Sequence, residues 1–141
     1  MNKISLAIFA NFFINNEERL QRMKDSFNSF KDINSREWVI NIRGNYKHQA
    51  GEFLKNELGD SLRLFYLQNK KGWFYDSIYI SNNISSDYVF FWVEDHILIN
   101  TLDSLKNCIF EMKTLNVDQL RYSFFQSDLL ERYKIEPIKI G

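Results

Sequence analysis

The chain has 141 residues, which suits one domain spanning 1–141 and able to bury a sizeable core. Its formal net charge is zero, so bulk charge favours neither nucleic acid nor an anionic membrane surface as a partner. Cys108 is the only cysteine, which excludes an internal disulfide and favours a reducing compartment. The N-terminal apolar segment meets Asn11 too soon for a signal peptide or membrane span, so we expect a soluble cytoplasmic protein.

Strand-like and helix-like segments alternate along the chain. Apolar runs rich in β-branched and aromatic residues predict strands at 4–10, 37–42, 62–67, 88–93 and 119–125. Apolar residues at helical spacing predict helices at 17–30, 48–58, 73–84 and 102–112, whereas 127–141 gives no prediction. Gly44 fits a tight turn after the second strand, and Gly59 fits the end of the second helix. The alternation predicts a three-layer α/β/α Rossmann-like domain with a mostly parallel sheet.

The segment 88–93 is followed directly by Glu94, Asp95 and His96. The segment is apolar without clean alternation, which is typical of a strand buried on both faces, so we expect it to be central in the sheet. Ligands of open α/β sheets bind beyond the carboxyl ends of the strands, which is where the three polar residues fall. Two carboxylates and an imidazole could hold a divalent cation there. The alternative is an exposed polar turn that closes the strand.

Common catalytic motifs are absent from the sequence. It contains no P-loop, no dinucleotide-binding glycine motif and no G-x-S-x-G elbow, which argues against three large enzyme classes. His48 and His96 lack zinc-ligand spacing, and we expect His48 to be a surface residue. Cys108 has no base near it in sequence and is interpreted as a small buried hydrophobe.

Polar residues follow each of the first four predicted strands. Asn11 follows the first, Arg43 the second and Lys70–Lys71 the third, while the triplet 94–96 follows the fourth. A parallel sheet brings such ends to one rim, where cationic groups beside a metal-type cluster suit a diphosphate bridged by a divalent cation. Trp73 could stack on a base or sugar there, although a core or interface role is the simpler interpretation of this residue.

A family resemblance follows from these residues. Residues 3–125 resemble the nucleotide-binding half of a GT-A fold glycosyltransferase, close to the large family 2 type, which begins with a strand, a loop and a helix as 4–30 does. Such enzymes carry an acidic Asp-x-Asp motif after a Tyr-Val-apolar-apolar lead-in. The stretch Ser86-Asp87-Tyr88-Val89-Phe90-Phe91 is similar to the lead-in and Glu94-Asp95-His96 to the motif, and Val117-Asp118-Gln119-Leu120-Arg121 is similar to a later strand.

The resemblance implies a nucleoside-diphosphate sugar as donor, Mn²⁺ or Mg²⁺ as cofactor, and an acceptor that could be a glycan or a lipid-linked glycan. It implies that the donor nucleotide is bound by Ala10, Asn11, Arg43, Lys70, Lys71, Trp73, Glu94 and Asp95. The metal would be bound by Glu94, Asp95 and His96. No nucleic-acid partner and no transmembrane segment are expected.

The sequence departs from the family pattern at three places. Arg43-Gly44-Asn45 stands where the family has a base-reading carboxylate. His96 ends the metal motif, as in the Asp-x-His of polypeptide N-acetylgalactosaminyltransferases, and a register shift of one residue would put Asp95 in the metal position. No counterpart of the acceptor-binding part is evident in 127–141, so the acceptor half is expected to be short or missing and the catalytic base is unassigned.

Three functional hypotheses remain. The first is a metal-dependent glycosyltransferase or its donor-binding domain, and the second is a non-catalytic nucleotide-sugar-binding or assembly module with the same fold. The third is a flavodoxin-like, Mg²⁺-binding receiver-type domain, which ranks last because the first strand ends at Asn11 rather than in paired acids. The cationic rim beside a metal-type cluster favours the first hypothesis.

Overall fold

The structure is a computed structural model that describes residues 4–99 and 101–119. The chain divides into two compact units, Met1–Ser104 and Leu105–Gly141, and each is described by itself. The predicted fifth strand lies outside the described residues except for Gln119, which belongs to no strand, and the tail 127–141 lies outside them entirely. Among the described residues, no helix has the length and apolar character needed to cross a membrane.

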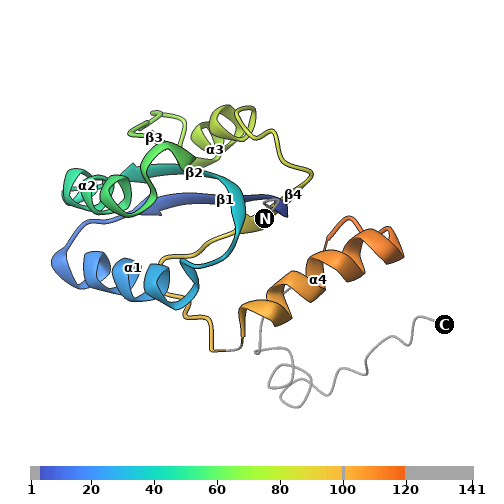
Figure 1. Cartoon of the computed structure of the whole chain (residues 1–141). Coiled ribbons are helices and arrows are strands. Elements are labelled where there is room, and N and C mark those ends of the chain that lie inside the picture. Colours follow the sequence, from blue (N-terminus) through green and yellow to red (C-terminus); the bar gives the residue numbers. More distant parts are fainter. Residues whose placement is uncertain (1–3, 100, 120–141) are drawn as a thin grey trace, which may run out of the picture. The chain divides into compact units, whose positions relative to one another are not determined.

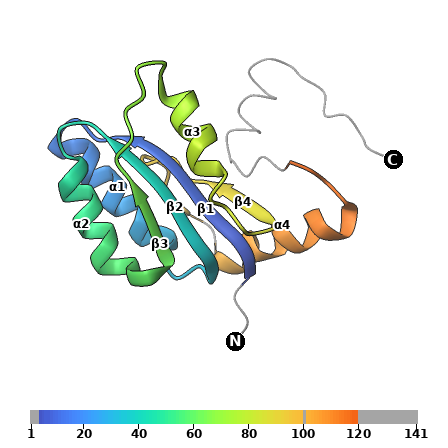
Figure 2. The ribbon, with the colours of Figure 1, turned by 90° about the horizontal axis from the view of Figure 1, so that it is seen from above.

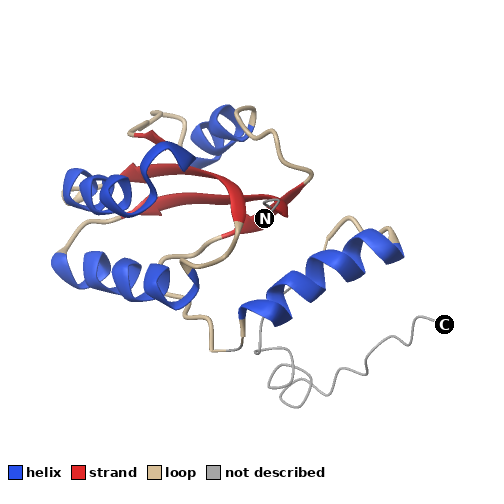
Figure 3. Ribbon diagram, viewed as in Figure 1, coloured by secondary structure: helices blue, strands red, loops and turns tan. Residues whose placement is uncertain are grey.

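Four parallel strands form the sheet, in the order β3-β2-β1-β4 (Figure 1). The strands are β1 (Ile4–Phe13), β2 (Ser35–Arg43), β3 (Leu62–Phe65) and β4 (Tyr88–Phe91). The helices are α1 (Glu17–Phe30), α2 (Lys47–Leu58), the 3₁₀ turn η1 (Gly59–Ser61), α3 (Trp73–Ser81) and α4 (Leu102–Leu115). Helices α1 and α2 cover one face of the sheet and α3 the other, as right-handed crossovers require (Figures 2 and 3). The predicted three-layer α/β fold is confirmed.

The face under α1 and α2 is closed by aromatic side chains. Phe27 and Phe30 of α1 lie against Trp38 of β2, with ring centroids 5.6 and 5.5 Å apart, respectively. Trp92, which follows β4, meets Phe12 of β1 at 4.6 Å with the rings edge to face. All five rings are buried. Aromatic rings of this size bury more apolar area than aliphatic side chains, so they supply much of the packing energy of this layer.

The opposite face packs under α3 with smaller residues. Phe9 of β1, Val39 of β2 and Ile80 of α3 form its buried apolar cluster, and Phe65 and Leu67 pack against it partly buried. Residues of alternating position in β1 and β2 supply the two faces, as the twofold repeat of a strand requires.

Two predictions about the strands are wrong. Strand β1 does not end at Ala10 but continues to Phe13, because Asn11, Phe12 and Phe13 pair with the last three residues of β2. Strand β4 is not central: it lies at the edge of the described sheet. It is also not buried on both faces, since Phe91 is 71% exposed and Val89 is exposed too. The reason is that α3 contacts β1 and β2, which leaves this side of β4 uncovered within the described unit.

The predicted helix ends agree with the structure to within a few residues. Helix α3 ends at Ser81 rather than at residue 84, and β3 ends at Phe65 rather than at 67. In the second unit, α4 bears out the helix predicted at 102–112 and continues to Leu115. Cys108 on α4 is partly buried, and this burial, with the nearby Glu111 carboxylate, raises the pKa of its thiol. A raised pKa keeps the thiol protonated and unreactive.

Candidate functional site

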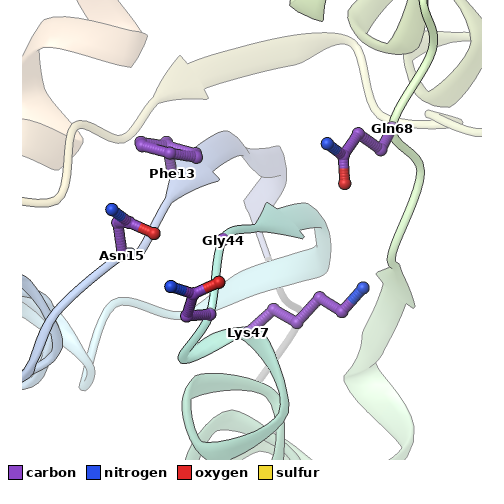
Figure 4. A pocket seen from close by; sticks show the side chains of 6 residues that line it. Phe13, Asn15, Gly44, Lys47 and Gln68 are labelled. Carbon is purple, nitrogen blue, oxygen red and sulfur yellow. The ribbon is translucent and has the colours of Figure 1, made fainter.

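A pocket of about 450 Å³ lies at the carboxyl ends of the first three strands (Figure 4). The loops that follow these strands supply its lining: Phe13 and Asn15 after β1, Gly44, Asn45 and Lys47 after β2, and Gln68 after β3. This is the edge of the sheet where ligands of open α/β folds bind. The sequence analysis places its candidate residues at this same edge, and one of them, Arg43, immediately precedes the lining residue Gly44.

The turn after β2 is held tightly against the chain that leaves β1. Gly44 has φ +99°, and a Cβ at this position would lie 2.4 Å from the carbonyl oxygen of Ile14. The Ile14 N–H donates to the Arg43 carbonyl at 2.8 Å, and the Tyr46 N–H donates to the Ile14 carbonyl at 3.0 Å. Only glycine fits this close approach without strain. The two loops thus form one fixed wall of the pocket.

The lining combines amides with one cation. Asn15, Asn45 and Gln68 each offer a carbonyl oxygen and an NH₂ group, so each can both donate and accept hydrogen bonds. Lys47 is the first residue of α2, a helix whose first turn has no acidic residue and whose N-cap, Tyr46, makes no side-chain cap. The partial positive charge of the helix N-terminus adds to that of the Lys47 ammonium. The pocket is therefore suited to a ligand that is polar at one end and anionic at the other.

Arg43 lies beside this lining. Its guanidinium carbon is 5.6 Å from the centroid of the Phe13 ring, a cation–π arrangement. Its Nε atom is buried and has no hydrogen-bond partner among the described residues. The predicted cationic residue after β2 is therefore placed at the pocket edge, with the aromatic ring holding its position.

Glu94 is held near the same edge of the sheet by Arg19, a residue that the sequence analysis did not single out. Arg19 of α1 donates through Nη1 to Glu94 Oε1 at 3.3 Å and to the Phe13 carbonyl at 3.1 Å. Asn16 caps α1 by accepting from the Arg19 N–H at 2.9 Å, which fixes where α1 begins. The Glu94 carboxylate is thus already paired with a cation, close to the end of β1.

Asp95 and His96 form an exposed pair next to Glu94. The His96 Nε2 and Asp95 Oδ1 atoms are 3.9 Å apart. The backbone turns here, with the His96 N–H donating to the Val93 carbonyl at 3.1 Å, and the His96 carbonyl accepts from the Ser26 hydroxyl of α1. Within the part of the chain that the structure describes, no three acidic, histidine or cysteine side chains gather closely enough to hold a metal ion.

Asn11 uses its side chain inside the fold. Its amide nitrogen donates to the Trp73 carbonyl at 3.0 Å and to the Ser77 hydroxyl at 2.8 Å, and its oxygen accepts from Asn41 at 3.0 Å. These bonds face α3, whereas His96 lies against α1 on the other side of the sheet. The structure therefore does not bring Asn11 and His96 together. Ala10 is buried within β1, three residues before the strand ends.

The remaining predicted residues lie where β3 is joined to α3. Lys70 and Lys71 are exposed in the loop after Gln68, and the Lys71 ammonium is 5.4 Å from the centroid of the Tyr75 ring. Trp73 begins α3 and is more than half exposed. His48 is exposed, as predicted, and its ring centroid lies 5.0 Å from that of Tyr66, with the two rings tilted.

No protein-family model, no curated protein and no solved structure matches this chain.

Sequence reasoning missed most of the pocket lining. Phe13, Asn15, Asn45, Lys47 and Gln68 were not among the predicted site residues, yet each lies within a few positions of a strand end. A usable signal was the stretch after the second strand, where a glycine turn is followed by an amide and a lysine. That pattern places a cation at a helix N-terminus, which is where anions bind.

Proposed function

We propose that this chain binds a nucleoside-diphosphate sugar, as the donor-binding domain of a GT-A-type glycosyltransferase. The observation that supports this most is the pocket at the carboxyl ends of β1, β2 and β3, with amides around it and cations beside it. The parallel sheet with α1 and α2 on one face and α3 on the other is the framework that such a domain needs. The sequence resemblance points to the same ligand.

The nucleoside end would occupy the amide-lined part of the pocket. The Phe13 ring offers an apolar surface for a base or ribose, and its position is held by Arg43 on one side. The amides of Asn15 and Asn45 could pair with both donors and acceptors on a base edge. A site that matches a base in this way discriminates against bases whose pattern leaves a buried polar group unpaired.

The diphosphate would be held by positive charge. Lys47 and the N-terminus of α2 supply charge within the pocket, and Arg43 supplies it at the edge. Cationic groups and backbone N–H donors at a helix N-terminus stabilise phosphate oxygens, and they would also stabilise the charge that develops on a leaving nucleoside diphosphate. Arg19 extends this row of cations toward Glu94.

The three predicted metal ligands do not fit equally. Glu94 is already bound to Arg19, so it could ligate a cation only after losing that ion pair. Asp95 and His96 are exposed, with Oδ1 and Nε2 3.9 Å apart, so these two side chains would hold the cation together. We assign Mn²⁺ or Mg²⁺ binding to these two residues, where the cation would neutralise the diphosphate.

The test is calorimetric titration of the purified chain with UDP, GDP and CDP sugars, with and without Mn²⁺. We expect one nucleotide to bind more tightly than the other two and Mn²⁺ to strengthen its binding. His96→Ala should remove most of the Mn²⁺ enhancement, whereas His48→Ala, at an exposed histidine on α2, should leave it intact. Binding of none of the three nucleotides would overturn the proposal, and equal effects of the two histidine variants would overturn the metal assignment.

A further inference from the structure

Helix α3 presents large apolar side chains to solvent. Trp73, Phe74 and Tyr79 are 58%, 59% and 59% exposed, and Tyr75 and Ile78 are each close to half exposed. The helix has only nine residues, so these five make up more than half of it. Isolated apolar side chains on a surface are ordinary, but a contiguous group of this size marks an interaction surface.

The inner side of the helix packs on the sheet through Ile80, next to the polar Asp76 and Ser77. Ile80 faces the sheet and is fully buried with Phe9 and Val39. An exposed apolar group of this extent on a helix that is already packed on a sheet is normally covered by a partner or a membrane. The outer side of α3 therefore calls for an apolar cover that the described unit does not itself provide.

The exposed charges of α3 and of the two residues before Gly72 are positive. Asp76 is the only acidic residue of α3, and it is turned inward, 4% exposed, where its carboxylate accepts from the Asn69 N–H at 3.0 Å. Lys70 and Lys71 precede the helix and are exposed, and neither forms an ion pair with any described carboxylate. Aromatic side chains and two ammonium groups thus share one surface that exposes no carboxylate of α3.

We propose that this surface binds an anionic lipid membrane. We call it the α3 patch; its residues are Lys70, Lys71, Trp73, Phe74, Tyr75, Ile78 and Tyr79. Trp and Tyr concentrate at the headgroup level of bilayers, and Lys side chains beside them pair with anionic headgroups. At nine residues α3 is about 13 Å long, far short of the ~30 Å hydrocarbon core, so it would lie in the interface.

The zero net charge of the whole chain is compatible with this proposal, because headgroup attraction acts only within about a Debye length of the membrane. Single-stranded nucleic acid fits the patch less well. Proteins that bind it without sequence preference combine stacking aromatics with a positively charged groove that follows the backbone, whereas the α3 patch has two lysines at one end of a helix. Another part of this chain or a second copy of it would be the other possible cover of the α3 patch. Iodide quenching of Trp73 in the free chain distinguishes both from membrane binding.

The three tryptophans make a direct test possible. Trp38 and Trp92 are 3% and 4% exposed, whereas Trp73 lies in the α3 patch, so changes in emission on binding report Trp73. The full chain is titrated with vesicles of phosphatidylcholine containing about 30% phosphatidylglycerol, in about 0.15 M salt. We expect a blue shift, loss of iodide quenching and new quenching by brominated lipid. Trp73→Phe should abolish these signals while vesicle co-sedimentation persists.

Two double variants test the two halves of the patch. Lys70→Glu with Lys71→Glu, and Phe74→Ser with Tyr79→Ser, should each weaken co-sedimentation by roughly tenfold or more, because each removes charge attraction or buried apolar area. Phe110→Ser, at a 70% exposed aromatic on α4, serves as the matched control and should bind like the parent chain. Vesicles of phosphatidylcholine alone should bind at least roughly tenfold more weakly than the anionic vesicles.

Several results would overturn the proposal. The first is absence of binding to anionic vesicles. The second is protection of Trp73 from iodide quenching in the free chain, which would show that another segment of the chain covers α3. If this protection grows with protein concentration, a second copy of the chain covers α3 instead. The third is vesicle binding that survives both double variants. Nucleotide titration of the variant with Phe74→Ser and Tyr79→Ser keeps this test separate from the proposed function, because neither residue lines the pocket or is among the predicted donor-binding residues.

Discussion

The two faces of the sheet are held by different interactions. Under α1 and α2, the contacts are between large aromatic rings. The ring centroid of Phe27 lies within 6 Å of those of Trp38, Phe53 and Trp92. Under α3 the apolar cluster is small, and polar side chains fasten both ends of the helix to the strands. Aromatic packing is non-directional and follows buried area, whereas hydrogen bonds require particular geometry.

The two polar attachments lie at opposite edges of the sheet. At the carboxyl edge, buried Asn41 accepts from the Leu67 N–H at 2.7 Å and donates to Asn11, which in turn holds the start of α3. At the amino edge, buried Glu37 accepts from the Ser85 and Ser86 N–H groups at 2.7 and 2.8 Å. The α3 face is therefore positioned by few directional bonds, and it is this face that adjoins Gln68 of the pocket and the α3 patch.

This difference suggests a division of roles. The aromatic face supplies stability through contacts between rings, which do not depend on the ionisation of a side chain. The α3 face sets the position of α3 and of the loop before it, and one of its two attachments depends on an ionised carboxylate.

Phe27→Ala should destabilise the fold most. The ring is 1% exposed and contacts three other aromatic side chains, so its removal leaves a cavity in the α1/α2 layer. Large-to-small changes of this kind cost about 3–5 kcal/mol, measured as the free energy of unfolding in urea. Phe74→Ala, at an exposed ring on α3, is the matched control and should change stability by no more than about 0.5 kcal/mol. Similar losses from both would contradict the account of the two faces.

Asn41→Ala should lower the free energy of unfolding by less than Phe27→Ala does, and its effect should be local. The substitution leaves the Leu67 N–H without its acceptor and removes the donor to Asn11, and unpaired buried groups cost about 1–3 kcal/mol. Hydrogen exchange at the Leu67 amide should accelerate more than exchange at Trp92, whose N–H donates to the Phe9 carbonyl in β1. Asn56→Ala, at an exposed position on α2, is the control. A uniform acceleration across the sheet would indicate global destabilisation instead of a lost attachment.

Glu37→Gln should have an effect that depends on pH. Burial alone would raise the pKa of Glu37. Four hydrogen bonds to its carboxylate nevertheless lower this pKa below its ordinary value of 4.5; they come from the Ser85 N–H, the Ser86 hydroxyl, the Ser86 N–H and the Ser85 hydroxyl. A carboxyl whose folded pKa is lowered stabilises the fold above its unfolded pKa, and this stabilisation is lost as pH falls through the folded pKa.

At pH 7 the Glu37→Gln variant should therefore be less stable than the parent, by about 1–2 kcal/mol for lost charge-assisted hydrogen bonds. This difference in the free energy of unfolding should shrink as the pH is lowered below 4.5, because the parent then loses its ionised carboxylate. Denaturant unfolding at a series of pH values measures this, with Glu52→Gln at an exposed site on α2 as the control. A gap that stays constant or widens at low pH would show that ionised Glu37 is not what holds the loop before β4.

The order of elements could be read from the sequence because strands and helices differ in the spacing of their apolar residues. The exposure of β4 could not be read from the sequence. Val89 and Phe91 are as apolar as the buried residues of β1, and burial depends on which element packs above a strand. For the same reason Trp73 could be interpreted as either a core or a ligand-binding residue, whereas the structure leaves it exposed.

The pocket lies at the sheet edge where the sequence analysis placed its candidate residues, but none of those residues is in its lining. The sequence suggested that the first strand ends at Ala10, which made Asn11 a rim residue, whereas pairing with β2 carries β1 on to Phe13. Asn11 then lies within the strand, where its side chain bonds to α3, and Phe13 at the strand end lines the pocket. The Arg19–Glu94 pair joins residues 75 positions apart, and no local pattern in the sequence could reveal it.

The central claim is that the pocket at the carboxyl ends of β1, β2 and β3 binds a nucleoside diphosphate. The most direct measurement compares two lysines of α2 in a nucleotide titration: Lys47, which lines the pocket, and Lys55, which lies in the last turn of the same helix. Lys47→Ala should weaken nucleoside-diphosphate binding about tenfold or more, as expected for a lost charge-assisted bond, and Lys55→Ala should leave it unchanged. Equal affinities of the two variants for the nucleotide would contradict the claim.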